Sequence, residues 1–375
     1  MWFHRALFFA IAGVLVKHRQ VGINAVGLTN PDGHVIGLDI GATSVRAAVM
    51  SLGTHEGRPS VSVHGLGEVA LPQGAVLNGV VCDPVAVTNA LKQLWLVNKF
   101  ECRNVILGVS NQQIVVRDLQ VPNLPPEQLE KALPFQAREV IPLQLDQVLL
   151  DFTPLGPPDR VTDLVPGLLI ATPRQPVVAA VQAVERAGLH VARVDLSSFA
   201  ALRAIADENL AVEAVIDIGA HVTNIVIHAQ GVPKVVRTLT RGSQELTERI
   251  VDRVGITQPE AELAKRQLGL GDGDRRIGEA ILEGVRPLLT EIRSSVHYFT
   301  SSFAGLELER LSLTGGGAAL PGLARELETQ LSVATRVVDP LQHVRNRWAN
   351  KGTQEAETQR WATAVSVGLA MGAAA

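Results

Sequence analysis

The sequence predicts an α/β protein made of two related halves, with a smaller α+β module inserted between them. Three observations carry this prediction. Residues 35–49 and 213–227 form an internal repeat in which an apolar strand runs into Asp-Ile-Gly-Ala and a second strand. A third apolar strand runs into three glycines at 315–317. The chain of 375 residues is 46% hydrophobic and only 4% aromatic, so its core is built from aliphatic residues, as in sheets covered by helices.

Composition and charge exclude several classes of protein. Charged residues make up 19% of the chain and the formal net charge is −3. A disordered chain would be charge-rich and apolar-poor, and a near-neutral chain has no global field that attracts nucleic acid. We therefore expect a folded protein with no nucleic-acid partner. Cys82 and Cys102 belong to no metal-binding motif and are predicted to be reduced thiols, with a disulfide as the alternative.

The first 30 residues differ from the rest of the chain. An apolar run at 6–16 is flanked by basic residues on both sides. Eleven apolar residues are too few for a membrane-spanning helix, which needs about 20. Three interpretations remain: a short helix lying on a membrane or a partner, a signal peptide, or a disordered extension. We treat residues 1–34 as an extension and expect the globular part to begin near His34.

The first repeat predicts a strand near 35–40, a tight turn and a second strand near 45–49. Glycine in such a turn lets backbone N–H groups approach a phosphate closely, and hydroxyl groups add donors. An aspartate at the strand end is suited to holding Mg²⁺ through water. The candidate ligand-binding residues of this turn are Asp39, Gly41, Ala42, Thr43 and Ser44.

The second repeat supplies a matching turn, and the glycine-rich turn follows it. One Asp-x-Gly turn alone is weak evidence, because such turns are common. Two copies between apolar strands, followed by a strand that ends in three glycines, predict two turns that clamp a triphosphate and a backbone surface for a flat base. The candidate residues are Asp217, Gly219, Ala220, Thr223, Gly315, Gly316 and Gly317.

The remaining segments follow in a consistent order. Strands near 105–109 and 114–121 are expected to close the first half, as residues 35–121. An inserted α+β unit spans 122–193, with a helix from Pro126, strands near 148–152 and 167–172, a helix at 176–187 and a strand at 190–194. We assign residues 194–211 to a helix that returns to the first half, 212–345 to the second half, and 346–375 to a carboxy-terminal helix packing back on the first.

The three turns, in this order, resemble the two phosphate motifs and the adenosine motif of the actin-like ATPase superfamily, which includes actin, DnaK-type chaperones, sugar kinases, FtsA and PilM. The resemblance implies a duplicated ribonuclease-H-like fold of the actin/DnaK type, with an insertion resembling subdomain 1C of FtsA, and it implies ATP and Mg²⁺ as cofactors. Residues 261–269 resemble the helix that contacts adenosine in FtsA and the chaperones. Glu262 and Lys265 lie on one face of that helix, and the resemblance places them at the ribose and base.

Within the superfamily the chain resembles the PilM family of type IV pilus assembly proteins. The resemblance rests on the helix and Ile-Pro motif at 133–146, on Leu-Asp-Phe at 150–152, and on shorter pieces at 231–233 and 293–299. It implies a cytoplasmic protein peripheral to the inner membrane. The implied partners are the cytoplasmic tail of PilN, then PilO and the pilus motor proteins, and self-association is a further possibility.

Departures from the superfamily pattern bear on catalysis. Val222 stands where many members place a hydroxyl group, and the segment after Val194 lacks the carboxylate–proline pair of vigorous hydrolases. Asp195 is the nearby acid that could orient a water, so we expect ATP binding with at most slow hydrolysis. Two alternatives are a small-molecule kinase, for which no base or acceptor motif occurs, and an FtsA-like filament-forming ATPase. The last eleven residues contain no Lys or Arg, unlike the basic amphipathic tail of FtsA.

Overall fold

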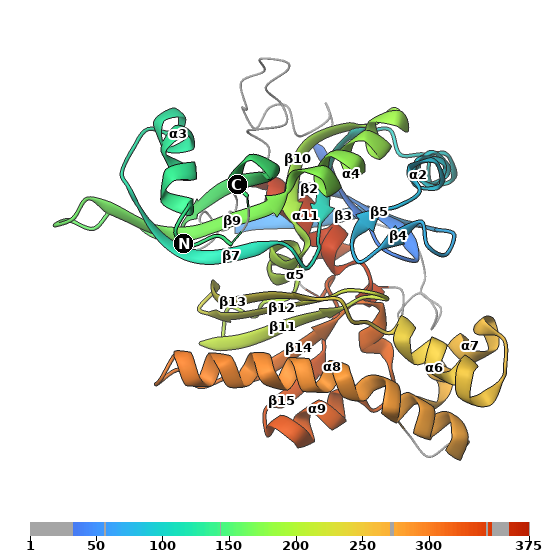
Figure 1. Ribbon diagram of the computed structural model, residues 1–375. Coiled ribbons are helices and arrows are strands. Elements are labelled where there is room, and N and C mark those ends of the chain that lie inside the picture. Colours follow the sequence, from blue (N-terminus) through green and yellow to red (C-terminus); the bar gives the residue numbers. More distant parts are fainter. Residues whose placement is uncertain are drawn as a thin grey trace.

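The computed structural model describes residues 33–374 apart from 56–57, 143, 271–273, 343 and 347–359 (Figure 1). Two sheet-containing halves lie one above the other, with a smaller sheet beside the upper one. The expected amino-terminal extension at 1–30 lies outside the described residues. The first strand begins at His34.

The first half is built on a six-stranded sheet in the order β10-β6-β1-β2-β3-β16. Strands β1, β2 and β3 form an antiparallel meander, β6 lies parallel beside β1, and β10 lies parallel beside β6. The bounds are β1 His34–Ile40, β2 Ser44–His55, β3 Arg58–Ala70, β6 Asn104–Val109, β10 His190–Leu196 and β16 Arg345–Asn346, with a short hairpin of β4 Val76–Leu77 and β5 Val80–Val81.

The second half repeats this topology in a five-stranded sheet, in the order β13-β12-β11-β14-β15. Strands β11, β12 and β13 form the meander, while β14 and β15 add in parallel beside β11. The matching order in the first half is β3-β2-β1-β6-β10, so the predicted duplicated α/β fold is confirmed. The bounds are β11 Val212–Ile218, β12 Thr223–Ala229, β13 Val232–Leu239, β14 Arg310–Thr314 and β15 Ala334–Val337.

Helices cover both faces of the first sheet. Helices α2 (Pro84–Asn98) and α4 (Arg174–Arg186) pack on one face, while α11 (Ala364–Met371) and α5 (Ser197–Ile205) lie on the face toward the second half. Two glycines allow α11 to approach its neighbours closely. A Cβ on Gly37 would lie 2.0 Å from the carbonyl oxygen of Ser366, and a Cβ on Gly368 would lie 1.8 Å from that of Ala200. The carboxy-terminal helix is therefore fitted between β1 and α5.

The inserted module is smaller than the sequence suggested. It consists of the sheet β7-β9-β8 with helix α3, and its bounds are β7 Val115–Pro122, α3 Pro126–Ala137, η3 Leu145–Gln147, β8 Val148–Pro154 and β9 Leu164–Pro173. Three expectations were wrong. The strand near 114–121, expected in the first half, is β7, which pairs with β9 along its whole length. The helix at 176–187, expected in the module, is α4, which packs on the first sheet. The strand at 190–194, also expected in the module, is β10 of the first sheet. Apolar strands of either sheet look alike locally, so their partners could not be predicted.

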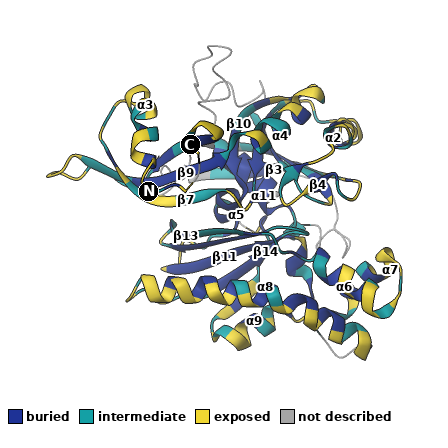
Figure 2. Ribbon diagram, in the orientation of Figure 1, coloured by how far each residue is buried: buried dark blue, intermediate teal, exposed yellow. Residues whose placement is uncertain are grey.

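The helices of the second half share its hydrophobic core with the sheet, and two of them, α6 and α7, contribute to the wall of the cleft. These helices are α6 Gln244–Val254, α7 Gln258–Leu268, α8 Arg275–Ser302 and α9 Leu323–Leu331, with short turns η4 Gly316–Ala319 and η5 Gly372–Ala374 elsewhere. Helix α7 begins with a capping box, in which Glu260 Oε2 accepts the Thr257 N–H at 2.8 Å. Helix α8 alternates buried and exposed residues along its length (Figure 2). Within the described ranges no helix is both long and apolar enough to cross a bilayer.

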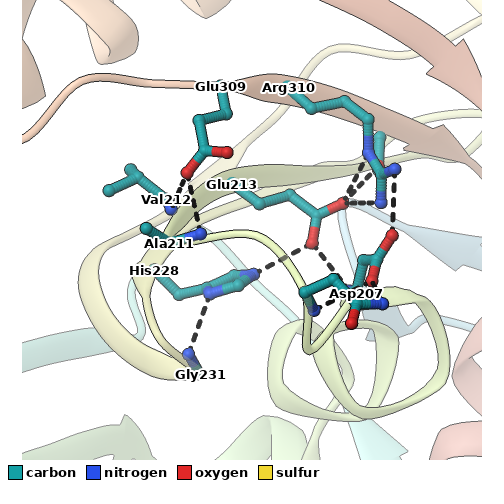
Figure 3. A network of polar contacts seen from close by, with 10 residues as sticks. Asp207, Ala211, Val212, Glu213, His228, Gly231, Glu309 and Arg310 are labelled. Atoms are coloured by element: carbon teal, nitrogen blue, oxygen red, sulfur yellow. Dashed lines mark hydrogen bonds and ion pairs between the residues drawn. The ribbon is translucent and has the colours of Figure 1, made fainter.

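A buried polar network holds the connector between the halves, residues 206–211, against the start of β11 (Figure 3). Glu213 is fully buried and is its centre. Its carboxylate accepts hydrogen bonds from the Asp207 N–H at 2.9 Å, from Arg310 at 2.8 Å and from His228 Nε2 at 3.2 Å. A buried carboxylate needs such partners to remain charged, so this network fixes the point where the chain enters the second half.

Candidate functional site

The two repeated turns have the same local geometry. In the turn between β1 and β2, the Gly41 N–H donates to the carbonyl oxygen of Ser44 at 3.0 Å; in the turn between β11 and β12, the Gly219 N–H donates to that of Val222 at 2.9 Å. A Cβ at Gly219 would lie 2.8 Å from the Val222 oxygen, closer than a side chain tolerates. The second turn therefore needs glycine for its tight closure, whereas a Cβ at Gly41 would lie 3.1 Å from the Ser44 oxygen, which is a tight contact. The residues that follow each glycine, Ala42 and Thr43 in the first turn and Ala220 and His221 in the second, line the cleft.

The cleft between the halves contains a cavity of about 450 Å³, within the usual range for ligand sites. Both repeated turns, the glycine turn after β14, the α6–α7 corner and the start of α11 contribute to its wall. The polar and glycine residues that line it include Asp39, Gly41, Thr43, Arg46, Ser110, Asn111, Asp217, Gly219, His221, Asn224, Ser243, Gln244, Thr247, Glu262, Lys265, Arg266, Gly315 and Gly316.

Two carboxylates line the cavity from opposite halves, with one guanidinium beside them. Arg46 Nη1 lies 3.9 Å from Asp39 Oδ2, and its Nη2 donates to Glu68 at 2.9 Å. Burial raises the pKa of Asp39 to about 6, against the opposing charge of Arg46, and Asp217 raises it further. Burial also raises the pKa of Asp217, although a hydrogen bond from Asn224 opposes the rise. A cation bound between the carboxylates would lower both pKa values.

The α6–α7 corner forms a second polar cluster in the same cavity. Lys265 Nζ lies 2.6 Å from Glu262 and donates to Thr247 at 2.8 Å and to the carbonyl oxygen of Ser243 at 3.1 Å. Burial lowers the pKa of Lys265, while Glu262 opposes the change. Burial acts to raise the pKa of Glu262, but the charge and hydrogen bonds of Lys265 and the Thr247 hydroxyl lower it overall. The cluster holds charged and hydroxyl groups in one fixed arrangement, suited to a ligand rich in hydroxyls.

The glycine turn after β14 closes the cavity on the third side. Gly315 has φ of +86°, and a Cβ there would lie 2.4 Å from the carbonyl oxygen of Ile218, so this position requires glycine. Gly316 lines the cavity with no atom within 4 Å of where a Cβ would stand. The backbone at Gly316 therefore offers an open flat surface.

Most of the sequence-predicted binding residues meet in this cavity, and a few stand behind it. The lining includes Asp39, Gly41, Ala42, Thr43, Asp217, Gly219, Ala220, Glu262, Lys265, Gly315 and Gly316. Ser44, Thr223 and Gly317 are outside the lining. Thr223 is fully buried and donates to the carbonyl oxygen of Arg241 at 2.8 Å, so its hydroxyl supports the second turn from behind.

The structure does not support the assignment of Asp195 as the residue that orients a water. Asp195 is buried and outside the cavity lining. One carboxylate oxygen pairs with Arg203 and the other accepts the Leu196 N–H at 2.7 Å. Because both oxygens are engaged within the protein, the role of this side chain is to hold α5 at the end of β10.

Several lining residues were missed by sequence reasoning, among them Arg46, Asn224, Ser110, Asn111 and Gln244. Arg46 and Asn224 could have been found from the hairpin register. The short turns place Arg46 directly opposite Asp39, and Asn224 directly opposite Asp217, and directly paired residues share a face of the sheet. Ser110 and Asn111 follow β6, which only the tertiary fold brings to the cleft.

The residues present fit a magnesium-bound nucleotide. Carboxylate oxygens and water are the ligands that Mg²⁺ prefers, with phosphate completing its shell. Among the described residues, the buried Nε of Arg46 has no hydrogen-bond acceptor, and a buried donor of this kind is normally satisfied. An anionic group at the first turn would satisfy it. A bound metal would be held by Asp39 and Asp217, and a ribose and base would be held by the α6–α7 corner and the glycine turn.

Comparison with known proteins finds similarity across most of the chain. Residues 37–374 match the family model of type IV pilus assembly protein PilM. Cell division protein FtsA of Bacillus subtilis (strain 168) is 24% identical over 353 residues, covering 81% of this chain and 78% of FtsA. The structure is similar to a PilM-PilN type IV pilus biogenesis complex, with TM-score 0.78, 29% identity, and coverage of 91% of this chain and 98% of the other.

A further solved structure shares the fold alone. The ethanolamine utilization protein EutJ of Carboxydothermus hydrogenoformans gives a TM-score of 0.53 at 17% identity, covering 91% of this chain and 90% of that protein. The duplicated architecture is therefore found in proteins with different roles, and the residues of the cleft decide what each one binds.

Proposed function

The chain belongs to the PilM family of type IV pilus assembly proteins, an actin-like ATPase family related to FtsA, and from that premise we propose that it is an ATP-binding scaffold whose nucleotide sets the angle between its halves. In this role it binds the cytoplasmic tail of PilN at the inner face of the inner membrane. PilO and the pilus motor proteins act downstream of that contact.

The observation that carries nucleotide binding is the convergence of both repeated turns on one cavity. Asp39 and Asp217 come from different halves, yet both line the cavity, and the charge of Asp217 contributes to the raised pKa of Asp39. Thr43 and Arg46 provide donors for phosphate on one side. Asp39 and Asp217 would hold a Mg²⁺ ion, which would supply positive charge to neutralise the phosphates. A ligand held by both halves stabilises one angle between them more than others, which is how a nucleotide selects a conformation.

We expect turnover of ATP to be slow. Asp195, the acid nearest the position where the superfamily orients a water, is paired with Arg203 and is not among the residues that line the cavity. General-base catalysis requires hydrogen-bond contact with the water that is activated. In this proposal bound nucleotide selects a conformation, and rapid ATP hydrolysis is not part of its role.

Titration with a fluorescent ATP analogue and Mg²⁺ tests the nucleotide site. Gly316→Leu places a side chain in the open part of the cavity and is expected to weaken binding at least tenfold by steric exclusion. Gly278→Leu on α8 is the matched control, because that glycine also has free space around it and lies outside the cavity. Asp39→Ala should weaken Mg²⁺-dependent binding as well. Equal, tight binding by wild type and Asp39→Ala would contradict the assignment of this cavity as the nucleotide site.

Capture on a peptide tests the partner. A peptide of about the first dozen residues of the neighbouring PilN should retain the full chain, and retention should change between apo and Mg²⁺–ATP conditions. A scrambled peptide of the same composition is the control. No retention under any nucleotide condition would count against the pilus scaffold, while retention that ignores nucleotide would remove only the conformational part of the proposal.

A further inference from the structure

A row of polar side chains crosses the second sheet at the edge of the cleft. Thr238 of β13 pairs with Asn224 of β12, Asn224 pairs with Asp217 of β11, and Asp217 pairs with Thr314 of β14. Directly paired residues project on the same face of a sheet, so these four side chains form one continuous row. Asp217, Asn224 and Thr314 are all buried.

Asn224 is the centre of this row and is held from three directions. Its amide nitrogen donates to Asp217 Oδ2 at 3.3 Å, and its oxygen accepts the Thr238 hydroxyl at 3.1 Å. The same oxygen accepts the Ser110 hydroxyl at 2.7 Å. An amide oxygen has two lone pairs, and both are used here. The orientation of Asn224 is therefore tied to the position of Asp217.

The bond from Ser110 crosses between the halves. Ser110 is the first residue after β6 of the first sheet, whereas Asn224 belongs to the second. The loop that carries Ser110 is backed by Gly79, where a Cβ would lie 1.6 Å from the Ser110 carbonyl oxygen. It turns tightly, because Asn111 Oδ1 accepts the Gln113 N–H at 2.9 Å. The polar row of the second sheet is thus hydrogen-bonded, through Asn224, to the short packed loop that carries Ser110.

That loop leads directly into the inserted module. Strand β7 begins at Val115 and pairs along its whole length with β9. Four residues, 111–114, therefore link Ser110 to the first strand of the module.

We propose that Ser110 and Asn224 form a hydrogen-bonded latch across the cleft, through which the state of Asp217 is transmitted to the inserted module. The proposal rests on the nucleotide site described above. A cation, or a water bound to it, competes with the Asn224 amide for Asp217 Oδ2. When Asp217 is engaged by the cation, the Asn224 amide is released to reorient, and its bond to Ser110 changes. The two states differ in one hydrogen-bond partner of Asp217, which gives a ligand the differential interaction that coupling requires.

Hydrogen exchange of the full chain, read by mass spectrometry with and without Mg²⁺ and a non-hydrolysable ATP analogue at saturation, tests the latch. In wild type, nucleotide should change exchange in peptides that cover 111–122 at least twofold. Ser110→Ala should abolish that change at nucleotide concentrations that saturate the variant. Thr238→Val is the matched control, because it removes the other hydroxyl bond to the same Asn224 oxygen within the second half. The Thr238→Val protein should keep the nucleotide-dependent change in hydrogen exchange at 111–122.

The outcomes separate this inference from the proposed function. Failure of wild type to bind nucleotide in the titration overturns both. Nucleotide binding with no change in 111–122 overturns the latch alone. A Ser110→Ala protein that keeps the response, or a Thr238→Val protein that loses it equally, also overturns the latch, since the cleft-crossing bond would then have no special role.

Discussion

The central hairpins of the two halves share one register, yet the residues paired beside their aspartates differ. In the first half Asp39 is opposite Arg46, which is itself paired with Glu68. In the second half Asp217 is opposite Asn224, with neutral hydroxyl groups beyond it. One turn therefore carries a full positive charge beside its carboxylate, and the other carries amide and hydroxyl groups. The same fold provides a charged side suited to phosphate and a neutral side suited to hydrogen-bonded contact between the halves.

The opposite ends of the same hairpins differ as well. In the first half the buried pair is Val35 with Met50, whereas in the second half the matching pair is Glu213 with His228. Burial acts to raise the pKa of Glu213, but hydrogen bonds from His228, Ser312, the Asp207 N–H and Arg310 lower it overall. The connector enters only the second half at this point, and its backbone N–H needs an acceptor (Figure 3). An apolar pair would leave that donor unsatisfied.

The largest expected effect is on the free energy of unfolding, for a substitution of Glu213 at the start of β11. Glu213→Ala leaves Arg310 and the connector N–H without their buried acceptor and should cost about 3–5 kcal/mol. The matched substitution in the first half, Val35→Ala, removes two methyl groups and should cost about 2 kcal/mol. Urea unfolding of both variants measures the difference. The contribution of the Glu213 carboxylate is present above its unfolded pKa of 4.5 and is lost as pH falls through its lowered folded pKa. Equal losses in the two variants at pH 7 would contradict this ranking.

The contrast between the halves also marks what could be predicted from sequence. The two Asp-Gly turns and the glycine turn were found because each is a local signal, an apolar strand that runs into glycine. Arg46 and Asn224 were within reach, because a short turn fixes which residues are opposite Asp39 and Asp217. Pairings between distant segments were not predictable. Ser110 reaches Asn224, which is 114 positions further along the chain, only because the two halves pack together, and no local pattern shows that.

An intermediate effect is expected for Asp39. Its folded pKa of about 6 lies above its ordinary 3.8, so the metal-free protein holds this proton more tightly than the unfolded chain does. Wild type should lose stability from this group as pH rises from about 4 to about 6, by roughly 2–3 kcal/mol. Asp39→Asn should remove that loss and be more stable than wild type at pH 7. Thermal unfolding in EDTA across this pH range is the measurement, with Asp118→Asn on the exposed face of β7 as control. An Asp39→Asn variant less stable than wild type at pH 7 would contradict a raised folded pKa for Asp39.

The smallest expected effect is on nucleotide affinity. It tests whether the charged residue beside the first turn, Arg46, holds phosphate. Arg46→Met keeps an unbranched apolar stem and removes the charged guanidinium, so phosphate at the first turn would lose a charge-assisted hydrogen bond. We expect Mg²⁺–ATP to bind about tenfold more weakly, about 1.4 kcal/mol. Arg237→Met is the control, because Arg237 pairs with Glu291 outside the cavity. Isothermal titration of both variants makes the comparison. If Arg46→Met binds as tightly as Arg237→Met, the charged turn does not hold phosphate, and the division of roles between the two hairpins would have to be reversed.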